Sequence, residues 1–525
     1  MNKRKIVIVG GGTAGWMTAG FLAKFRDDDI TVIESANIPK LFVGESVTPH
    51  VCNFLTRLGI NEHHWMESTG AVYKFANKFV NWNGINDQQY FSFTYTVPTT
   101  NFYKDIPVNV SDKDFSNITN KSRSFDVINA MFHSDEIDRF DQYFNPQHHY
   151  MEKNVMPRFN GESILNQPFS NAHHVNAELI ADYIRDNVAL PNGVTHIIDT
   201  VVTVNIVDKN IKSLMLESKK EITADLFIDC TGLARILSTA LDWPFKKYNT
   251  PIDSAWVCQT DYETPNNELV NYTQSIAEPY GWRFKIGLYY RMGNGYCYSG
   301  NHISDDDALD YFTKQIGSQR ITPKLLKWVP GRLEKFGEGN CAAIGLSCGF
   351  TEPLEANALY TIVTSILRLN NVLDGQDIDF TIYNEKMAQT IDDIKNFILV
   401  HYTLGQRVDT NFWKDMKALG VEENHKKLVI DKIYNEKNTM KSATEGYTMF
   451  PDYMWAQLAT HWGIEYFSDF TDPIAIQLAK QFFIFSESKH NMISAQCTNN
   501  YEWHKENIFQ SLNNKEWEQK YVVRR

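Results

Sequence analysis

The fold of this chain is decided by one stretch near its start, Lys5-Ile-Val-Ile-Val-Gly-Gly-Gly-Thr-Ala-Gly-Trp16. Residues 5–9 are mostly apolar, which is typical of a strand buried in a parallel sheet. The glycines Gly10, Gly12 and Gly15 follow in the spacing G-x-G-x-x-G, and residues 16–25 carry apolar side chains at helical intervals. The stretch therefore predicts a strand, a tight turn and a helix, the opening of a dinucleotide-binding βαβ unit.

The chemistry of such a turn is the binding of a pyrophosphate. Glycine lets the backbone approach the phosphates closely, and their negative charge lies at the positive N-terminal end of the helix. A second predicted strand, residues 30–33, ends at Glu34, where a carboxylate can accept hydrogen bonds from a ribose. The glycine triplet alone is also compatible with an ordinary tight turn, but the strand, the helix and the acidic residue together favour a dinucleotide site.

A second segment indicates which dinucleotide to expect. Residues 224–232, Ala-Asp-Leu-Phe-Ile-Asp-Cys-Thr-Gly, form an apolar strand that ends in small residues. Flavoproteins use such a segment to bring the chain back beside FAD, although a plain buried strand followed by a turn explains it equally well. Because the sequence has no second G-x-G-x-x-G for NAD(P)H, we expect FAD as the cofactor and an external source of electrons for it.

The composition sets further bounds on function. The chain has 525 residues, 43% of them hydrophobic and 22% charged, which predicts a soluble globular protein of about two to four domains. Its net charge of −12 argues against nucleic-acid binding, and the lack of a long uncharged apolar run argues against a membrane span. No signal peptide is recognisable before the first strand, so we expect a cytoplasmic location. The seven scattered cysteines form no C-x-x-C pair, which favours reduced thiols over disulfides or a metal site.

The remainder of the chain changes from α/β to helical character. Strands are predicted at 194–204, 212–217 and 225–229, and long helices at 378–400 and 470–486. Residues 84–124 are rich in Asn, Asp, Ser, Thr and Tyr, which predicts an irregular insertion or a lid.

This pattern predicts the domain organisation. We expect a discontinuous FAD-binding module over residues 1–355, with substrate-region insertions near 84–170 and 250–335. The residues that follow, 356–525, are expected to form a mostly helical substrate-binding region.

Several further segments carry a family resemblance. The densest is residues 344–355, Ile-Gly-Leu-Ser-Cys-Gly-Phe-Thr-Glu-Pro-Leu-Glu, a run too long and specific to arise by chance. The other matching segments are Gly10 to Trp16, Val43-Gly-Glu-Ser46 with Pro49, Lys78 to Trp82, His173 to Ala177, Gly281 to Ile286, Gly295 to Ser299 and His401-Tyr402. With these segments the chain resembles the flavin-dependent tryptophan halogenase family, over nearly its whole length up to about residue 415.

The resemblance implies an α/β fold in which a glutathione-reductase-like FAD-binding module carries a mostly helical substrate module. It implies that a separate flavin reductase supplies FADH2, which agrees with the missing NAD(P)H motif. In the family, a flavin C4a-hydroperoxide oxidises a halide ion to hypohalous acid, which halogenates an electron-rich aromatic substrate by electrophilic substitution. The implied partners are therefore a small aromatic substrate and the reductase, and a homo-oligomer is compatible with a family whose members are often dimeric.

Two residues match the family's catalytic positions. Lys78 is matched to the lysine that hydrogen-bonds or covalently captures the halogen species and orients it. Its alternative is an ordinary solvated lysine, although strand alternation over 74–82 places it in a mostly apolar set. Glu355 is matched to the carboxylate that stabilises the cationic ring intermediate or accepts its proton, and its alternative is a first-turn acid that complements a helix dipole.

The resemblance assigns the other site residues by their positions. The cofactor-binding residues that it implies are Gly10, Gly12, Thr13, Ala14, Gly15, Glu34, Val43, Glu45, Val201, Gly345, Leu346 and Leu359. The halide is expected at Asn357 and Ala358, and the passage between flavin and substrate at Trp282 and Phe284. No metal is expected.

The sequence departs from the family near this chemistry. The family's Trp-x-Trp-x-Ile-Pro is Trp282-Arg-Phe-Lys-Ile-Gly287 here, so the second Trp is Phe284. After Glu355 the family has Ser-Thr-Gly or a similar sequence, whereas this chain has Ala-Asn-Ala, in which the amide of Asn357 and backbone N–H groups can still bind a halide. Residues 84–124 and 440–500 show no counterpart of the family's tryptophan-binding regions. These departures favour bromide or iodide over chloride and a substrate other than tryptophan.

Two other functions stay open on the sequence alone. An FAD-dependent aromatic monooxygenase is compatible with the altered Trp282 motif, but hydroxylation requires neither Lys78 nor Glu355. A non-catalytic flavin-binding protein would have no reason to keep the lysine, the Pro-Leu-Glu segment and the buried aromatic residues. An FADH2-dependent halogenase is the interpretation that accounts for all of these features.

Overall fold

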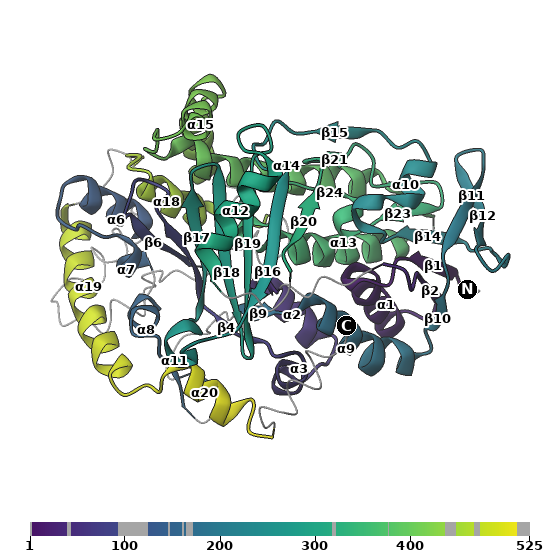
Figure 1. The fold of residues 1–525 in the computed structure, drawn as a ribbon, viewed down its shortest axis with the longest axis horizontal. Helices are drawn as coiled ribbons and strands as arrows, with labels where there is room; N and C mark the ends of the chain where they lie inside the picture. The colour runs from purple at the N-terminus through teal and green to yellow at the C-terminus, as the bar shows by residue number, and fades with distance from the viewer. Residues whose placement is uncertain are drawn as a thin grey trace. The chain divides into compact units, whose positions relative to one another are not determined.

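The computed structural model describes residues 3–38, 44–92, 124–144, 147–159, 162–163, 172–317, 322–375, 377–435, 448–466 and 473–511. The chain forms two compact units, and Figure 1 labels many of their elements. Unit 1 consists of residues 1–72, 173–260 and 293–396, and unit 2 of residues 73–172, 261–292 and 397–525. The chain passes from one unit to the other within β4 (Val72–Lys74), β9 (Ala172–Val175), β19 (Arg291–Tyr298) and α14 (Thr381–Leu404), and directly after β16 (Ser254–Thr260).

Unit 1 is built on a six-stranded sheet with the strand order β10-β2-β1-β14-β23-β22. Its strands are β10 (Thr195–Ile198), β2 (Asp29–Glu34), β1 (Lys5–Val9), β14 (Leu226–Asp229), β23 (Cys341–Ala343) and β22 (Gly337–Glu338). The first five run parallel, and β22 pairs antiparallel with β23. Ile8 lies between Val32 and Ile228, and all three are fully buried. This burial explains the continuous apolar run after Lys5, because strands covered on both faces do not alternate.

Helix α1 (Thr13–Phe25) follows β1 after the glycine turn and lies against β1 and β2 (Figure 1). It also contacts α9 (Ala177–Ile184) and α13 (Asn357–Leu373) of the same unit. Residues 15–22 of α1 are all buried, so this helix has no wide solvent face in its middle. The predicted strand, turn and helix are confirmed, with the helix beginning at Thr13 rather than at residue 16.

Three smaller sheets and several helices complete unit 1. A separate antiparallel sheet has the order β11-β12-β13, another has the order β15-β21-β24, and β3 pairs with β9. The bounds of the remaining elements are β3 (Glu45–Ser46), α2 (Pro49–Arg57), α3 (Glu62–Thr69), η1 (Arg185–Ala189), η2 (Leu190–Asn192), β11 (Val201–Val207), β12 (Asn210–Leu216), β13 (Glu221–Ile222), η3 (Gly232–Ala234), α10 (Ile236–Ala240), β15 (Phe245–Lys247), α12 (Asp305–Ile316), β20 (Lys324–Lys327), β21 (Gly331–Leu333), η4 (Gly345–Ser347), β24 (Gly349–Phe350) and η5 (Leu354–Ala356). The strand predicted over 194–204 is thus two strands, β10 and β11, which belong to different sheets.

Unit 2 contains strands as well as helices. Its strands follow the order β18-β17-β5-β6, in which β5 (Ala76–Val80) is parallel to β17 (Tyr272–Glu278) and antiparallel to β6 (Gln88–Ser92), while β18 (Gly281–Leu288) pairs with β17. Strand β6 corrects the expectation of irregular chain over 84–124, because residues 88–92 add an edge to this sheet. The rest of that segment, 93–123, lies outside the described residues.

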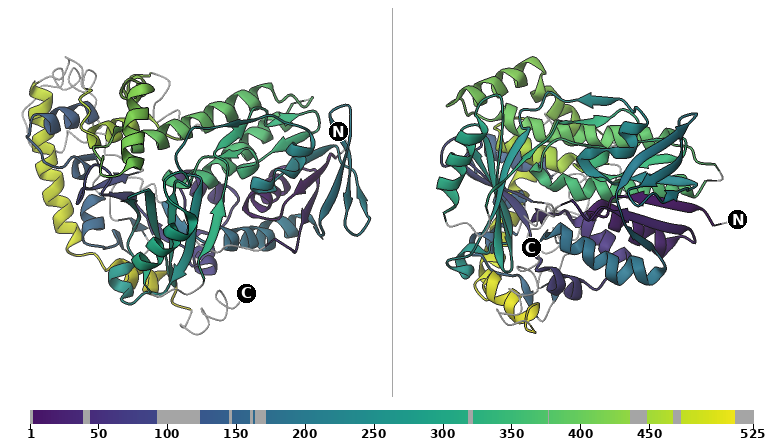
Figure 2. Two further views of the ribbon diagram at one scale, coloured as in Figure 1. Left: turned by 45° about the horizontal axis from the view of Figure 1, so that its top comes forward. Right: turned by 45° about the vertical axis from the view of Figure 1, so that its right-hand side comes forward.

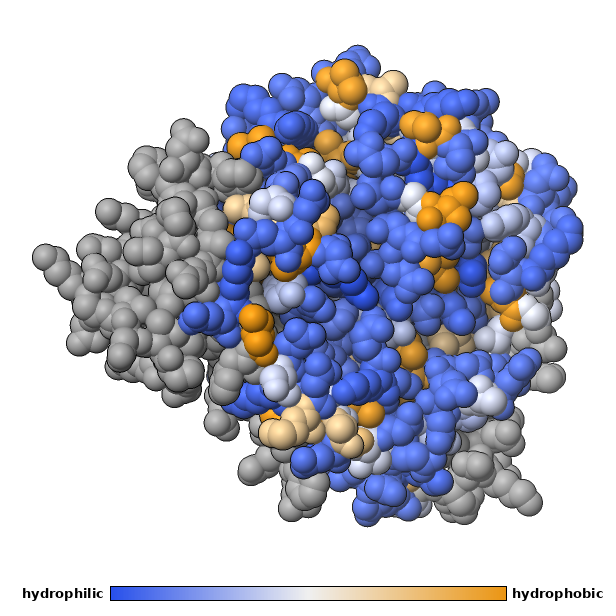
Figure 3. Space-filling model, turned by 90° about the vertical axis from the view of Figure 1, so that its left-hand side faces the viewer, coloured by the Kyte–Doolittle hydropathy of each residue, from blue (hydrophilic) through white to orange (hydrophobic). Residues whose placement is uncertain are grey.

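The helices of unit 2 come mainly from the C-terminal part of the chain. They and the short hairpin β7–β8 have these bounds: α6 (Ser124–His133), α7 (Asp141–Phe144), α8 (His148–Glu152), β7 (Arg158–Phe159), β8 (Glu162–Ser163), α11 (Pro265–Glu268), α15 (Asn411–Glu422), α16 (His425–Ile433), α18 (Asp452–His461), α19 (Pro473–Ser494) and α20 (Asn500–Asn507). Helix α19, yellow in Figure 2, contacts α6 and α8. The face drawn in Figure 3 is mostly hydrophilic, with hydrophobic residues in small separate groups, as on ordinary soluble surfaces.

The units divide the chain differently from the predicted modules. Helix α13 and most of α14, which we expected in a helical substrate region, belong to unit 1. The physical reason is that α13 packs against α1 and α2, so it is part of the core around the parallel sheet. Unit 2 in turn combines strands from two separate stretches of sequence, 73–172 and 261–292, with the C-terminal helices.

Candidate functional site

The three glycines of the β1–α1 turn differ in why the structure accepts glycine at their positions. Gly10 has a φ of +113°, and a Cβ at this position would lie 2.3 Å from the carbonyl oxygen of Cys230. A Cβ at Gly15 would lie 1.8 Å from the carbonyl oxygen of Gly10, so the helix can approach the turn only without a side chain. A Cβ at Gly12 would meet no atom within 4 Å. Gly10 and Gly15 are therefore required by the fold, whereas Gly12 borders open space.

This open space lies at the N-terminal end of α1. Gly12 is the N-cap residue of the helix and has no side chain that could accept from the first-turn N–H groups. The hydroxyl of Thr13 donates to the carbonyl of Ala177 at 3.2 Å and so faces α9. The free N–H groups and the helix dipole fit a negatively charged group such as a diphosphate.

Glu34 closes β2 beside the same turn. Its Oε2 atom lies 2.9 Å from Nε2 of His196, which stands on the neighbouring strand β10. A Cβ at Gly11 would come within 2.4 Å of Oε2 of Glu34, so this carboxylate lies directly against the turn. Glu34 therefore lies beside the glycine turn, while its role toward a ribose stays a prediction, and its histidine partner is a feature that the sequence did not indicate.

Among the other predicted cofactor residues, Gly345 approaches the start of α1. Gly345 has a φ of +71°, and a Cβ here would lie 3.1 Å from Cβ of Ala14, which brings the η4 turn against the start of α1. Leu359 is 2% exposed on α13, and Leu346 is partly exposed in η4.

The remaining predicted cofactor residues are more dispersed. Glu45 lies on β3, where burial and the nearby carboxylate of Glu178 raise its pKa to about 7. Val201 begins β11 in the separate three-stranded sheet. Val43 lies outside the described residues.

Glu355 is held in an unusual backbone conformation at the start of α13. It has φ 66° and ψ 20°, and the next residue, Ala356, has φ 58° and ψ 34°. Left-handed conformations cost about 1–2 kcal/mol for residues with a Cβ, and such strain is concentrated at functional sites. The Glu355 side chain is buried, with 3% exposure. The helix predicted after it begins two residues later, at Asn357.

The structure corrects the expected role of Asn357. Its Nδ2 atom donates to the carbonyl oxygen of Glu352 at 2.8 Å and to that of Leu354 at 2.7 Å. A side-chain amide has two N–H donors, so both are engaged within this loop and neither points to a halide. Asn357 therefore braces the turn that carries Glu355, and any halide near the partly exposed Ala358 would depend on backbone N–H groups.

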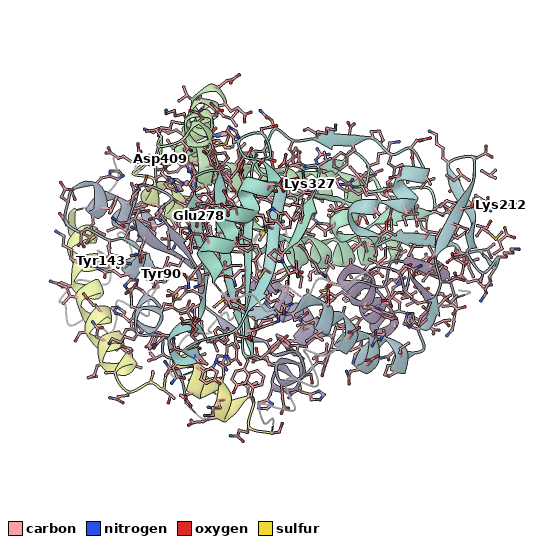
Figure 4. The ribbon with its side chains drawn as sticks, in the orientation of Figure 1. Tyr90, Tyr143, Lys212, Glu278, Lys327 and Asp409 are labelled. Atoms are coloured by element: carbon pink, nitrogen blue, oxygen red, sulfur yellow. The ribbon has the colours of Figure 1, made fainter. Side chains whose placement is uncertain are left out.

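Lys78 lies in a cluster of tyrosines in unit 2. It stands on β5 opposite Tyr90 of β6, and its Nζ atom is 4.9 Å from the centre of the Tyr90 ring and 5.5 Å from that of Tyr272. Tyr90, labelled in Figure 4, is hydrogen-bonded to Glu152, and burial is the main reason that its pKa is raised. Burial lowers the pKa of Lys78, but the lysine side chain is only half-buried.

A second lysine, Lys74, was missed in the sequence. It lies four residues before Lys78, at the end of β4, and is completely buried with 0% exposure. Lysines are almost never fully buried without a specific role or partner. The signal was present, because Lys74 is the one charged residue in the apolar run from Ala71 to Ala76, whereas Lys78 follows the polar Asn77.

Trp282 and Phe284 lie two residues apart on β18 and so face the same side of the sheet. Both are buried, and their ring centres are 5.9 Å apart. The ring of Trp82 is 6.5 Å from that of Trp282 and is fixed by a hydrogen bond from its Nε1 to the carbonyl of Ser275 on β17. The predicted aromatic pair is thus part of a buried aromatic cluster.

The described residues contain no group of three or more His, Cys, Asp or Glu side chains that could hold a metal ion. Across the same parts of the chain, no helix is both long and apolar enough to cross a membrane.

The chain is similar to known proteins over most of its length. Residues 5–479 match the family model described as tryptophan halogenase. The 7-chloro-L-tryptophan 6-halogenase KtzR of Kutzneria sp. (strain 744) is 31% identical over 434 residues, 79% of this chain and 82% of that protein. The structure of the tryptophan 6-halogenase SttH of Streptomyces toxytricini superposes with a TM-score of 0.82 at 26% identity, covering 96% of this chain and 99% of the other. Xcc4156, a flavin-dependent halogenase from Xanthomonas campestris, gives a TM-score of 0.81 at 25% identity over 96% and 98% of the two chains.

Proposed function

Since this chain belongs to the tryptophan halogenase family and is an enzyme of this flavin-dependent class, we propose that it is an FADH2-dependent halogenase that transfers an electrophilic halogen to an electron-rich aromatic ring. The observation that carries the proposal is Glu355, a carboxylate buried in a strained turn of a specific sequence motif. An aromatic monooxygenase would have no need of such a group.

In this proposal unit 1 holds FAD in a glutathione-reductase-like manner, and features of its glycine turn support this assignment. The open space beside Gly12 and the N-terminal end of α1 suit the diphosphate, and Glu34 stands where a ribose hydroxyl would lie. When bound as FADH2, the cofactor would supply two electrons that reduce O2 to the peroxide level, and an oxidant at this level converts a halide to a hypohalous acid. A separate flavin reductase would deliver it, because the sequence has a single dinucleotide motif.

Two lysines are candidates for guiding the oxidised halogen, and burial favours Lys74 over Lys78. A reactive halogen species survives only where water and competing nucleophiles are excluded, and Lys74 is 0% exposed. Lys78 instead stands over the phenol rings of Tyr90 and Tyr272, within 4.9 Å and 5.5 Å of their centres. Phenols are electron-rich arenes, so a halogen held at Lys78 would be consumed by these tyrosines.

Glu355 would act on the aromatic substrate. As an electrophile adds to the ring, positive charge develops, and a buried carboxylate stabilises this charge strongly because little water screens it. The same carboxylate can accept the proton that leaves the ring. The left-handed turn and the brace from Asn357 hold the Glu355 backbone fixed, so no ordering is needed during the reaction.

The decisive test is a mass-spectrometric screen of the purified protein with FAD, a flavin reductase, NADH and an arene panel, repeated with chloride, bromide and iodide. We expect products heavier by one halogen in place of hydrogen. A product heavier by one oxygen would support the monooxygenase, and an unchanged panel would support a non-catalytic flavin-binding protein. Without the reductase we expect no NAD(P)H consumption, and efficient consumption would contradict the proposed supply of FADH2.

Point variants separate halogen transfer from flavin oxidation. Lys74→Ala should abolish halogenation while O2 still oxidises supplied FADH2 at nearly the wild-type rate. Lys78→Ala is the matched control and should retain most product; if it loses all product while Lys74→Ala does not, the role belongs to Lys78. Glu355→Gln should lower the product rate on the order of a hundredfold, because a neutral amide cannot stabilise the developing charge.

A further inference from the structure

Three side chains of unit 1 outside the proposed halogenation chemistry form a chain of polar contacts. The Sγ atom of Cys52 on α2 is 3.0 Å from Nδ1 of His173 on β9. The Nε2 atom of the same imidazole is 3.3 Å from Oε1 of Glu62, the first residue of α3. The imidazole is fully buried, and the ring of Trp65 packs edge-on against it at 4.9 Å between ring centres.

This order of thiol, imidazole and carboxylate is suited to activating the thiol. A thiolate is the reactive form of cysteine, and a neighbouring imidazolium stabilises it. The imidazole accepts the thiol proton at Nδ1, and the carboxylate of Glu62 stabilises the positive charge that results. Trp65 fixes the ring orientation, so the three groups are arranged before any reaction occurs.

Cys52 is also accessible, which most cysteines of the chain are not. Five of the seven cysteines are buried, and Cys52 and Cys497 are partly exposed. The thiol of Cys497 donates to the carbonyl of Ile493, and burial raises its pKa. Cys52 makes the same kind of contact, with the carbonyl of Thr48 at 3.6 Å, but it also lies against the imidazole of His173. Cys497 is therefore an internal control of the same exposure class.

We propose that Cys52, His173 and Glu62 form a peroxide-reactive thiol site, at which Cys52 is oxidised to a sulfenic acid. The Cys52 thiolate attacks one oxygen of hydrogen peroxide, an S–O bond forms and the O–O bond breaks. The leaving hydroxide takes the proton from the His173 imidazolium and departs as water. Sulfur is oxidised by two electrons and the peroxide is reduced by two electrons, so the step needs no other reactant.

The site borders a segment assigned to the cofactor. Strand β9, which carries His173, pairs with β3, where Glu45 lies opposite Val175. The N–H of Val47 donates to the carbonyl of His173 at 2.9 Å. Helix α2 with Cys52 follows directly, so the thiol lies within the structure that positions Glu45.

The test uses the full-length protein, hydrogen peroxide at limiting amounts and dimedone as the sulfenic acid probe, with labelled peptides identified by mass spectrometry. We expect Cys52 to be labelled at least about tenfold faster than Cys497. Iodoacetamide alkylation of Cys52 should also continue below about pH 7, where an ordinary thiol is protonated. Equal rates and equal pH profiles for the two cysteines would overturn the proposal.

Two variants test whether His173 and Glu62 activate the Cys52 thiol. His173→Gln should reduce the Cys52 rate to that of Cys497, and Glu62→Gln should lower it severalfold and move the alkylation profile to higher pH. The side chain of Glu62 is 43% exposed, so we expect Glu62→Gln to fold normally. This variant therefore still tests the proposal if the buried His173→Gln substitution prevents folding. Wild-type reactivity in the folded Glu62→Gln protein, together with an unchanged profile, would show that the contacts are only structural.

Discussion

Gly12 is the residue whose substitution separates cofactor binding from folding. Its φ of −81° is accessible to any residue, and a Cβ meets no protein atom within 4 Å. Gly12→Val should therefore fold normally but fill the space proposed for the diphosphate. We expect FAD affinity to fall on the order of a hundredfold, about 2.7 kcal/mol, measured by flavin fluorescence titration.

The control for this prediction is Gly15→Val. Its Cβ would lie 1.8 Å from the carbonyl oxygen of Gly10, so this variant should lose the fold together with FAD binding, as seen by circular dichroism and thermal unfolding. If Gly12→Val bound FAD like the wild type, the diphosphate would have to lie elsewhere.

Glu45 makes the stability of the protein depend on pH near neutrality. Burial and Glu178 raise its folded pKa to about 7, above the ordinary value of a glutamate, so the folded state holds a proton that the unfolded state has lost. The free energy of unfolding should fall as pH rises from about 4.5 through about 7, with a slope below the limit of about 1.4 kcal/mol per pH unit because Glu45 is partly exposed. Below the ordinary glutamate pKa this contribution is fully present.

Denaturant unfolding at several pH values checks this expectation. Glu45→Gln should remove this part of the pH dependence and stabilise the protein most at alkaline pH. Glu178→Gln should weaken the dependence, since it removes the neighbouring charge that contributes to the shift. An unchanged pH profile in Glu45→Gln would mean that Glu45 is ionised normally in the folded protein.

At the scale of elements, the η5–α13 turn depends on the amide of Asn357. Asn357→Ala removes two hydrogen bonds to buried carbonyl groups, which we expect to destabilise the protein by about 2–4 kcal/mol. It should also lower kcat, because Glu355 loses its fixed position, while the apparent KM for halide stays nearly constant. Steady-state kinetics with varied halide would measure both, and a large rise in the halide KM at constant kcat would restore Asn357 as a halide ligand.

The elements also show how far local sequence patterns extend. The buried strands β1, β2 and β14 were predictable because each is a short apolar run bounded by polar or glycine residues. The run over 194–204 was assigned to one strand. Apolar periodicity does not reveal that the chain leaves the sheet of β10 after residue 198 and enters the sheet of β11 at residue 201. Strand β6 was missed because its five residues include two glutamines, and its strand conformation comes from pairing with β5.

At the scale of the whole molecule, the substrate is predicted to be an electron-rich arene other than free tryptophan. Among the similar proteins, SttH is named as a tryptophan 6-halogenase, and the description of Xcc4156 as a flavin-dependent halogenase names no substrate. The departures at Phe284 and after Glu355 support a reshaped site. A halide site made of backbone N–H groups alone would be looser than one with a side-chain donor. We therefore expect it to accept bromide and iodide, which are also easier to oxidise than chloride.

Steady-state comparison of tryptophan with indoles, phenols and anilines, each with three halides, tests this prediction. We expect the highest kcat/KM for an indole, phenol or aniline with bromide or iodide. A tryptophan value well above all others, with chloride as the best halide, would contradict both the substrate and the halide assignment.

The sequence by itself determined the glycine turn, the strand before it, the helix after it and the family, because these depend on local spacing, glycine conformation and long motifs. Only the tertiary structure decided which groups are buried and paired. It distinguished Lys74, at 0% exposure, from the half-buried Lys78, and it turned the amide of Asn357 toward two carbonyl groups. It also brought His173 to Cys52 across 121 positions of sequence. Burial and such contacts arise from packing between distant segments, which no local pattern encodes.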